Sequence, residues 1–206
     1  MKNYIFSLFV AIFITGCKSS PNTDLANLNI LNYINPFIGT SGHGHTFPGA
    51  AYPFGMVQLS PDTGLEGWDW CSGYHYSDSS IIGFSHTHLS GTGRSDLMDI
   101  MLMPTTGDIK LQAGTKEDPD SGYRSRFSHK EEWASPGYYK VNLKDYNIIA
   151  ELTTSPRCGF HKYTFPQNKE SHIIIDLSHH YDKDSVIFTS LNLVDSCTIT
   201  GQRNTK

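Results

Sequence analysis

The sequence predicts an all-β protein built as an antiparallel β-sandwich, and three observations support this prediction. From about residue 29 onward, short apolar runs alternate with turn residues, and no stretch carries apolar residues at helical spacing. The runs recur roughly every 10–13 residues, without the helix-length crossovers that parallel strands need. The 18 glycines and the 12% aromatic residues are typical of a turn-rich β protein.

Composition and charge exclude two other classes of protein. With 38% hydrophobic and 17% charged residues, the 206-residue chain is too apolar to remain disordered. Its 16 basic residues against 20 acidic ones give neither a basic excess nor a basic stripe. We therefore expect no nucleic-acid partner.

The N-terminal residues read as a processing segment. Lys2 precedes the uncharged run Ile5–Ile14, which is shorter than the roughly 20 residues a membrane-spanning helix needs. The box Ile14-Thr-Gly-Cys17 resembles a bacterial lipoprotein cleavage site, so residues 1–16 are predicted to be a lipoprotein signal peptide and Cys17 the lipid attachment site. The alternative is a plain secretory signal with an incidental cysteine. Residues 17–28 are mostly polar and are predicted to be a flexible tether.

The expected strands follow from apolar runs and from alternation. Tyr139, Val141 and Leu143 alternate with polar residues, which indicates a half-buried strand, and Pro61 and Pro104 are expected to end two others. The polar, charged segment Gln112–Glu132 is expected to be a surface loop. In chain order, strands are predicted in Gly55–Ser60, Ile81–Phe84, Asp99–Met103, Tyr139–Leu143, Asn147–Thr153, Gly159–Phe165, His172–Leu177, Val186–Thr189 and Val194–Thr200.

Two loops rich in Gly, Pro, His and Trp, Thr40–Pro53 and Gly64–Tyr76, interrupt this rhythm, and functional residues commonly lie on such loops. The aromatic residues of the second loop, with Asp69 among them, suit one wall of a sugar site. The CH face of a pyranose packs on a flat ring, while a carboxylate accepts hydrogen bonds from vicinal hydroxyls. The alternative is an aromatic plug that fills one end of the sandwich. The aromatic residues are Trp68, Trp70, Tyr74 and Tyr76.

The histidines and cysteines define the remaining candidates. His43-Gly-His45 offers two arms of a metal site, with a third ligand to come from His75, His86 or His88. The alternative is that these histidines hydrogen-bond to backbone in a glycine-rich loop, and we expect no metal in this chain. After Cys17, the remaining cysteines allow one disulfide and one leftover thiol, with the pairing left open; they are Cys71, Cys158 and Cys197.

Taken together, these segments resemble glycoside hydrolase family 92, the bacterial calcium-dependent exo-acting α-mannosidases. The resemblance covers almost everything after the tether. It is carried by Tyr33–Thr40, His43–Ala50, Pro53–Thr63, Gly67–Asp69, Cys71–Tyr76, Gly83–Gly93, Ala134–Tyr139, Thr154–Arg157 and Tyr163–Pro166.

The resemblance implies that residues 29–206 are the N-terminal β-sandwich of such an enzyme. This domain would contribute to the rim of the active site, where mannose-containing glycans bind. In the family a larger (α/α)₆ domain follows and carries the general acid, the general base and the calcium ligands of an inverting mechanism. We therefore expect no catalytic residue in this chain. The resemblance assigns Trp68 to packing on the terminal mannose and Asp69 to the same substrate-binding rim, whereas His86 and His88 are expected to be structural.

The expected function is that of the N-terminal part of an α-mannosidase that hydrolyses terminal α-mannosides. The alternative is a stand-alone carbohydrate-binding or structural module without catalysis. The 206-residue chain alone is expected to be inactive and its sandwich to be incomplete at the C-terminus. Calcium is expected in the full-length enzyme only. The expected location is the bacterial outer membrane, through the lipid, with the periplasmic or surface side and the preferred mannoside linkage left open.

The lipoprotein prediction can be tested at Cys17. Because the thiol receives the lipid, Cys17→Ala is expected to leave the precursor uncleaved or to release the protein from membranes. Membrane fractionation and the mass of the processed chain measure this. Unaltered processing and membrane association in the variant would contradict the prediction.

Overall fold

The computed structural model describes residues 29–94, 97–167, 170–182 and 184–206 and divides the chain into two units. The first unit, Met1–Tyr33, contributes a short 3-10 helix, η2 (Ile30–Tyr33). The second unit, Ile34–Lys206, holds every strand described below. The predicted signal peptide, tether and Cys17 lie outside the described residues. Within the described ranges, no helix has the length and apolar character needed to cross a membrane.

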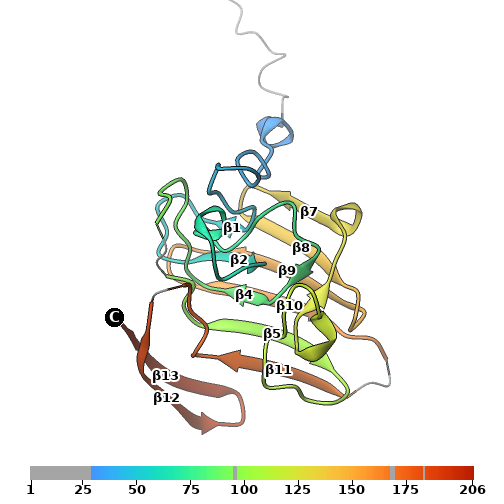
Figure 1. The fold of residues 1–206 in the computed structure, drawn as a ribbon, viewed down its shortest axis with the longest axis vertical. Helices are drawn as coiled ribbons and strands as arrows, with labels where there is room; N and C mark the ends of the chain where they lie inside the picture. Colours follow the sequence, from blue (N-terminus) through green and yellow to red (C-terminus); the bar gives the residue numbers. More distant parts are fainter. Residues whose placement is uncertain (1–28, 95–96, 168–169, 183) are drawn as a thin grey trace, which may run out of the picture. The chain divides into compact units, whose positions relative to one another are not determined.

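Two antiparallel sheets form the body of the second unit (Figure 1). A core cluster of buried side chains contains residues from both sheets, so the prediction of an antiparallel β-sandwich is confirmed. One sheet has the order β1 (Ala50–Ala51), β2 (Gln58–Asp62), β4 (Gly83–Ser85), β5 (Met101–Thr106) and β11 (Ser171–Asp176). The other has the order β10 (Gly159–Thr164), β9 (Ile148–Thr154), β8 (Tyr138–Leu143) and β7 (Glu132–Ser135).

Smaller elements complete the unit. β3 (Ser80–Ile81) pairs with β6 (Ser125–Arg126), and β12 (Val186–Asp195) forms a hairpin with β13 (Thr198–Thr205). The helical elements of the described second unit are 3-10 turns: η3 (Trp68–Trp70), η4 (Pro119–Ser121) and η5 (His129–Glu131).

Alternating side chains explain how β8 and β9 face the core. Tyr139, Val141 and Leu143 of β8 are buried while the residues between them are not, so the predicted half-buried strand is confirmed. The neighbouring strand β9 repeats the pattern, with Ile148, Ala150 and Leu152 buried. These side chains meet Phe84, Met101 and Met103 of the other sheet in the core cluster.

The prediction that Pro61 and Pro104 end two strands was wrong. Pro61 lies inside β2 opposite Phe84, and Pro104 lies inside β5 opposite Ile173. Proline removes only the N–H donor, so a strand continues through it wherever that donor is not required by the ladder. The two late strand predictions, Val186–Thr189 and Val194–Thr200, are parts of the single hairpin β12–β13.

The predicted surface loop Gln112–Glu132 was also partly wrong, because Tyr123, Arg124, Ser125 and Phe127 in it are buried. Two of them make hydrogen bonds across the fold: the Tyr123 hydroxyl donates to Asp176 at 2.9 Å, and Arg124 Nη2 donates to the Thr63 carbonyl at 3.2 Å. A polar side chain can be buried when it is hydrogen-bonded. The polar composition of this segment therefore did not show which of its residues are buried. Among the described residues the three cysteines are free thiols; Cys71 is buried, whereas Cys158 and Cys197 are exposed.

A buried carboxylate ties distant parts of the unit together. Asp62 of β2 is fully buried, with its two oxygens 2.8 Å from His88 Nε2 and 2.9 Å from His179 Nε2. Burial by itself raises the pKa of Asp62, but the charge of His88 and the hydrogen bonds from both imidazoles outweigh it and hold that pKa well below its usual value. Asp62 is therefore an ionised group at neutral pH.

A second polar bridge links the two sheets. His86 follows β4, and its Nδ1–H donates to the Ile100 carbonyl at 2.6 Å, which leaves Nε2 to accept from His161 Nε2 at 3.1 Å. His161 Nδ1 in turn faces the Tyr163 hydroxyl at 2.8 Å. Burial and the nearby charge of His86 lower the pKa of His161 to about 3. The bridge therefore requires neutral rings.

Asp62 is expected to be among the polar residues that stability depends on most. Asp62→Asn removes the charge that faces two buried imidazoles, and breaking a buried pair of this kind costs about 3–5 kcal/mol of unfolding free energy. Urea unfolding at neutral pH measures the loss. Asp120→Asn is the matched control, because its carboxylate pairs with Arg126 at an exposed site and little change is expected. Equal stability of Asp62→Asn and the unaltered chain would refute this role.

The His86–His161 bridge predicts an acid-sensitive fold. Since the pKa of His161 is about 3 in the fold against 6.5 ordinarily, the unfolded chain binds more protons than the folded chain between these values. The contribution of the neutral His161 ring to the free energy of unfolding is therefore complete above about pH 6.5, and it is lost as the pH falls toward about 3. Unfolding experiments from pH 7 to about pH 4 should show a steeper loss for the unaltered chain than for His161→Gln. His180→Gln, at a partly buried histidine outside the bridge, should follow the unaltered chain; parallel curves for all three proteins would contradict the prediction.

Candidate functional site

Trp68 and Asp69 lie together on η3, at the surface of the second unit. The Trp68 side chain is 58% exposed, yet its indole N–H donates to the Gly93 carbonyl at 3.0 Å. Its ring also packs against His43 and His45, with centroids 5.0 and 4.3 Å away. The indole is thus held in place from one side while a large part of it remains open to a ligand.

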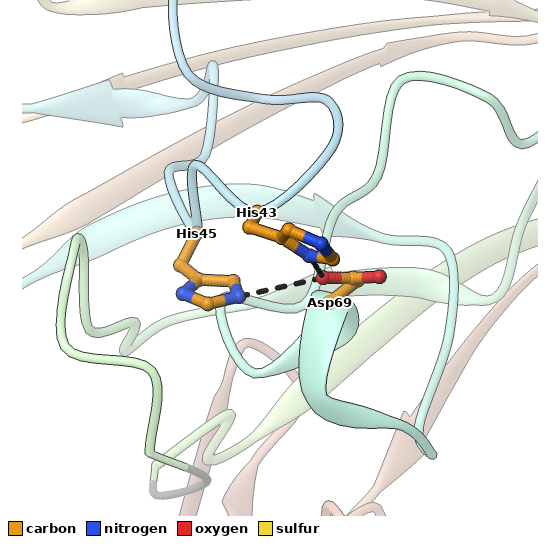
Figure 2. Close-up of side chains that lie close together, drawn as sticks. All are labelled: His43, His45 and Asp69. Atoms are coloured by element: carbon orange, nitrogen blue, oxygen red, sulfur yellow. Dashed lines mark hydrogen bonds and ion pairs between the residues drawn. The ribbon is translucent and has the colours of Figure 1, made fainter.

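The Asp69 carboxylate faces the two histidines that the sequence pairs as His43-Gly-His45 (Figure 2). Its Oδ1 accepts from His43 Nδ1 at 2.6 Å and lies 3.6 Å from His45 Nε2. The hydrogen bond from His43 is the main reason that the pKa of Asp69 lies below its usual value, with a smaller contribution from His45. Asp69 therefore presents an ionised carboxylate to the surface.

Gly44 makes the two imidazoles converge. A Cβ at this position would lie 2.1 Å from the Gly39 carbonyl oxygen, so only glycine allows this close approach of the chain to itself. The turn leaves His43 exposed but buries His45, whose side chain is 6% exposed. Among the described residues, His45 Nε2 has no hydrogen-bond partner.

The aromatic residues of Gly64–Tyr76 divide between the two alternatives considered for them. Trp70 donates to Asp78 at 2.6 Å and packs under Lys116, and the buried Tyr74 donates to Glu132. Tyr76 stacks on His129 with the ring centroids 3.9 Å apart. Trp68 is the most exposed of the four. Tyr74 therefore fills the interior, and Trp70 is partly covered. Tyr76 is exposed but stacked on His129, so Trp68 is the most open surface of the predicted wall.

The histidines considered as a third ligand beside His43 and His45 lie elsewhere in the fold. His75 contacts Ser77 and the Gly42 carbonyl, while His86 and His88 take part in the bridges described above. Asp69 takes the third position instead. Nothing in the sequence signals this pairing, because the carboxylate follows His43 by 26 residues and only the fold brings them together.

A cavity of about 430 Å³ opens beside Trp68. Gly93, Arg94 and the distant residues Tyr181, Asp182 and Asp184 complete its lining together with Cys71. The carboxyl and guanidinium groups suit a ligand with several hydroxyls. The sequence alone does not reveal Tyr181, Asp182 and Asp184 as part of this lining, since they follow Trp68 by more than a hundred positions and no local pattern marks them.

The cluster of His43, His45 and Asp69 does not fit calcium. Calcium takes six to eight oxygen ligands, and this cluster offers two ring nitrogens and one carboxylate. The three ligand atoms of this cluster lie within 4.8 Å of one another.

Comparison with known proteins gives one family. The family described as the glycosyl hydrolase family 92 N-terminal domain matches residues 33–206. An uncharacterized secreted glycosidase of Arthroderma benhamiae is 30% identical over 165 residues, which cover 73% of this chain and 20% of that protein.

Solved structures agree with this match. The family GH92 α-mannosidase BT3965 from Bacteroides thetaiotaomicron, in complex with mannoimidazole, superposes with a TM-score of 0.84 at 46% identity, covering 86% of this chain and 23% of that one. The family GH92 inverting mannosidase BT2199 from the same species gives a TM-score of 0.61 at 27% identity, covering 81% and 21%. The chain thus spans about a fifth to a quarter of the length of these relatives.

Proposed function

The chain belongs to the family of glycosyl hydrolase family 92 N-terminal domains, and we propose that it is the N-terminal part of an exo-acting α-mannosidase that acts on terminal α-mannosides of glycans. In this proposal Trp68 and Asp69 form part of the rim of the substrate site. The observation that carries the proposal is the exposed, anchored indole of Trp68 at the mouth of a polar cavity.

The geometry supports sugar binding in two ways. The indole offers a flat apolar surface to the CH face of a pyranose, and its fixed position means that little side-chain entropy remains to be lost on binding. Asp69 offers an ionised acceptor for hydroxyls next to that surface. Hydrogen bonding to His43 occupies one of its oxygens and leaves capacity on the other.

The chemical step is assigned to groups outside these residues. Inverting hydrolysis needs one carboxylic acid to protonate the leaving oxygen and one carboxylate to activate water, about 6.5–9.5 Å apart across the scissile bond. The proposal places both groups, and the calcium of the family, in a further domain. It also keeps the outer membrane as the location, with the lipid on Cys17 as the anchor.

Trp68→Ala is expected to lower kcat/KM roughly ten- to a hundredfold when this chain is joined to a catalytic domain of the family. The reason is the loss of a stacked ring, which contributes about 1–3 kcal/mol. Hydrolysis of a terminal α-mannoside measures the effect. Trp133→Ala is the matched control, because Trp133 on β7 is 53% exposed and lies outside the Trp68 cavity; no change is expected there.

An unchanged kcat/KM for Trp68→Ala, in a variant whose fold is intact, would assign Trp68 to a structural role. The 206-residue chain is assayed alongside and is expected to release no mannose. Calcium-dependent release of mannose by this chain alone, abolished by Asp69→Asn, would overturn the division of roles. Glycan binding by the chain alone without hydrolysis would favour a carbohydrate-binding module instead.

A further inference from the structure

We propose that His43, His45 and Asp69 form a binding site for a divalent transition-metal ion, with zinc as the best match. The three side chains come from the Gly44 turn and from η3, and their ligand atoms lie within 4.8 Å of one another (Figure 2). Two ring nitrogens and one carboxylate do not suit calcium.

The distances are close to those of a zinc site. Tetrahedral zinc with ligands at about 2.0–2.1 Å separates its ligand atoms by about 3.3 Å. His45 Nε2 lies 3.6 Å from Asp69 Oδ1, and His43 Nδ1 lies 2.6 Å from the same oxygen. The shorter contact must therefore open by less than about 1 Å. The His43 side chain is 71% exposed, so its ring is free to make this movement.

An independent observation at His45 points to a missing ligand. Its Nε2 is buried, has no hydrogen-bond partner among the described residues and is aimed at the Asp69 carboxylate from a distance too long for a hydrogen bond. Leaving a buried ring nitrogen unsatisfied costs free energy. A metal ion between His45 and Asp69 would satisfy this nitrogen, and the His45 ring is packed edge-on against Trp68 with the centroids 4.3 Å apart.

The donor set selects the class of metal. Calcium and magnesium prefer oxygen ligands, whereas two imidazoles and one carboxylate are ligands that zinc binds in many proteins. The Asp69 carboxylate is the acidic ligand among the three and supplies the negative charge that a dication needs. His43 presents Nδ1 to the metal once its proton is carried on Nε2 instead, which a neutral imidazole allows. Three protein ligands leave a fourth position for water.

Metal binding would also change the sugar rim, and this consequence alone rests on the proposed function. An ion held by Asp69 withdraws that carboxylate from sugar hydroxyls and lies against the Trp68 ring, which packs on both histidines. Zinc and glycan would then compete. The metal site itself is independent of any glycan.

Zinc binding by the purified full chain, prepared without a histidine tag, tests the proposal. Titration against a chromophoric zinc chelator should give one zinc ion per chain with a dissociation constant in the micromolar range or tighter, and cobalt(II) should give the strong visible absorption of a tetrahedral site. His43→Ala and Asp69→Asn should each weaken binding at least about tenfold. Both change exposed or half-exposed side chains, so the fold should survive, as circular dichroism can verify.

His180→Ala is the matched control, because it removes a partly buried histidine from outside the cluster and should leave zinc binding unchanged. Failure to bind zinc at about 100 μM would overturn the proposal. So would zinc binding that persists undiminished in folded His43→Ala and Asp69→Asn, because the ion would then be held elsewhere. None of these results depends on mannosidase activity, so failure here leaves the proposed function untouched.

Discussion

The buried carboxylate of Asp62 is the interaction on which the rest of the unit depends. It belongs to β2, but its two partners come from after β4 and after β11, so one ionised group fixes three segments that are far apart in the sequence. The chain packs closely around this carboxylate at Gly73. Gly73 has φ +82°, and a Cβ there would lie 2.3 Å from the Asp62 oxygen. Only glycine can bring the end of the loop Gly64–Tyr76, called the Trp68 loop below, this close to the carboxylate.

This contact explains how a loop without long secondary structure places a site. The Thr63 N–H donates to the Gly73 carbonyl at 2.7 Å, and the His75 N–H donates to the Thr63 hydroxyl at 3.0 Å. The end of the loop is therefore fastened to the residue that follows Asp62. Trp68 and Asp69, between these fixed points, take a defined position, and the Tyr181 hydroxyl, which donates to the Gly67 carbonyl, holds the loop from the other side.

The strands could be predicted from the sequence because burial alternates along them, as it does from Tyr139 to Leu143. The interior polar groups could not. Glu132 is buried and accepts hydrogen bonds from the hydroxyls of Tyr74 and Tyr139 and from His129, a set that only the fold brings together. For this reason Tyr74 reads as an exposed sugar contact in the sequence and is an interior donor in the structure.

For the candidate site, the sequence identified the loop and two of its residues but not the contacts between residues. The dense aromatic and glycine composition marked the Trp68 loop, and the family resemblance marked Trp68 and Asp69 within it. Composition gave no way to rank Trp68 above Trp70, since the distinction depends on Asp78 and Lys116, which cover Trp70. It also gave no way to pair Asp69 with His43, because long-range contacts leave no local pattern.

Exposure of an aromatic ring does not by itself indicate a site, and comparison of two tryptophans shows what does. Trp133 is nearly as exposed as Trp68, but it packs on Tyr138 beside Lys130 and Lys140. Trp68 instead has its indole N–H bound, its ring held by two imidazoles, and carboxylates beside it. Holding an apolar ring open to water offsets part of the stability gained by burying apolar surface. The surrounding polar contacts fix that ring in one orientation next to hydrogen-bond acceptors, which is the arrangement a sugar ring requires.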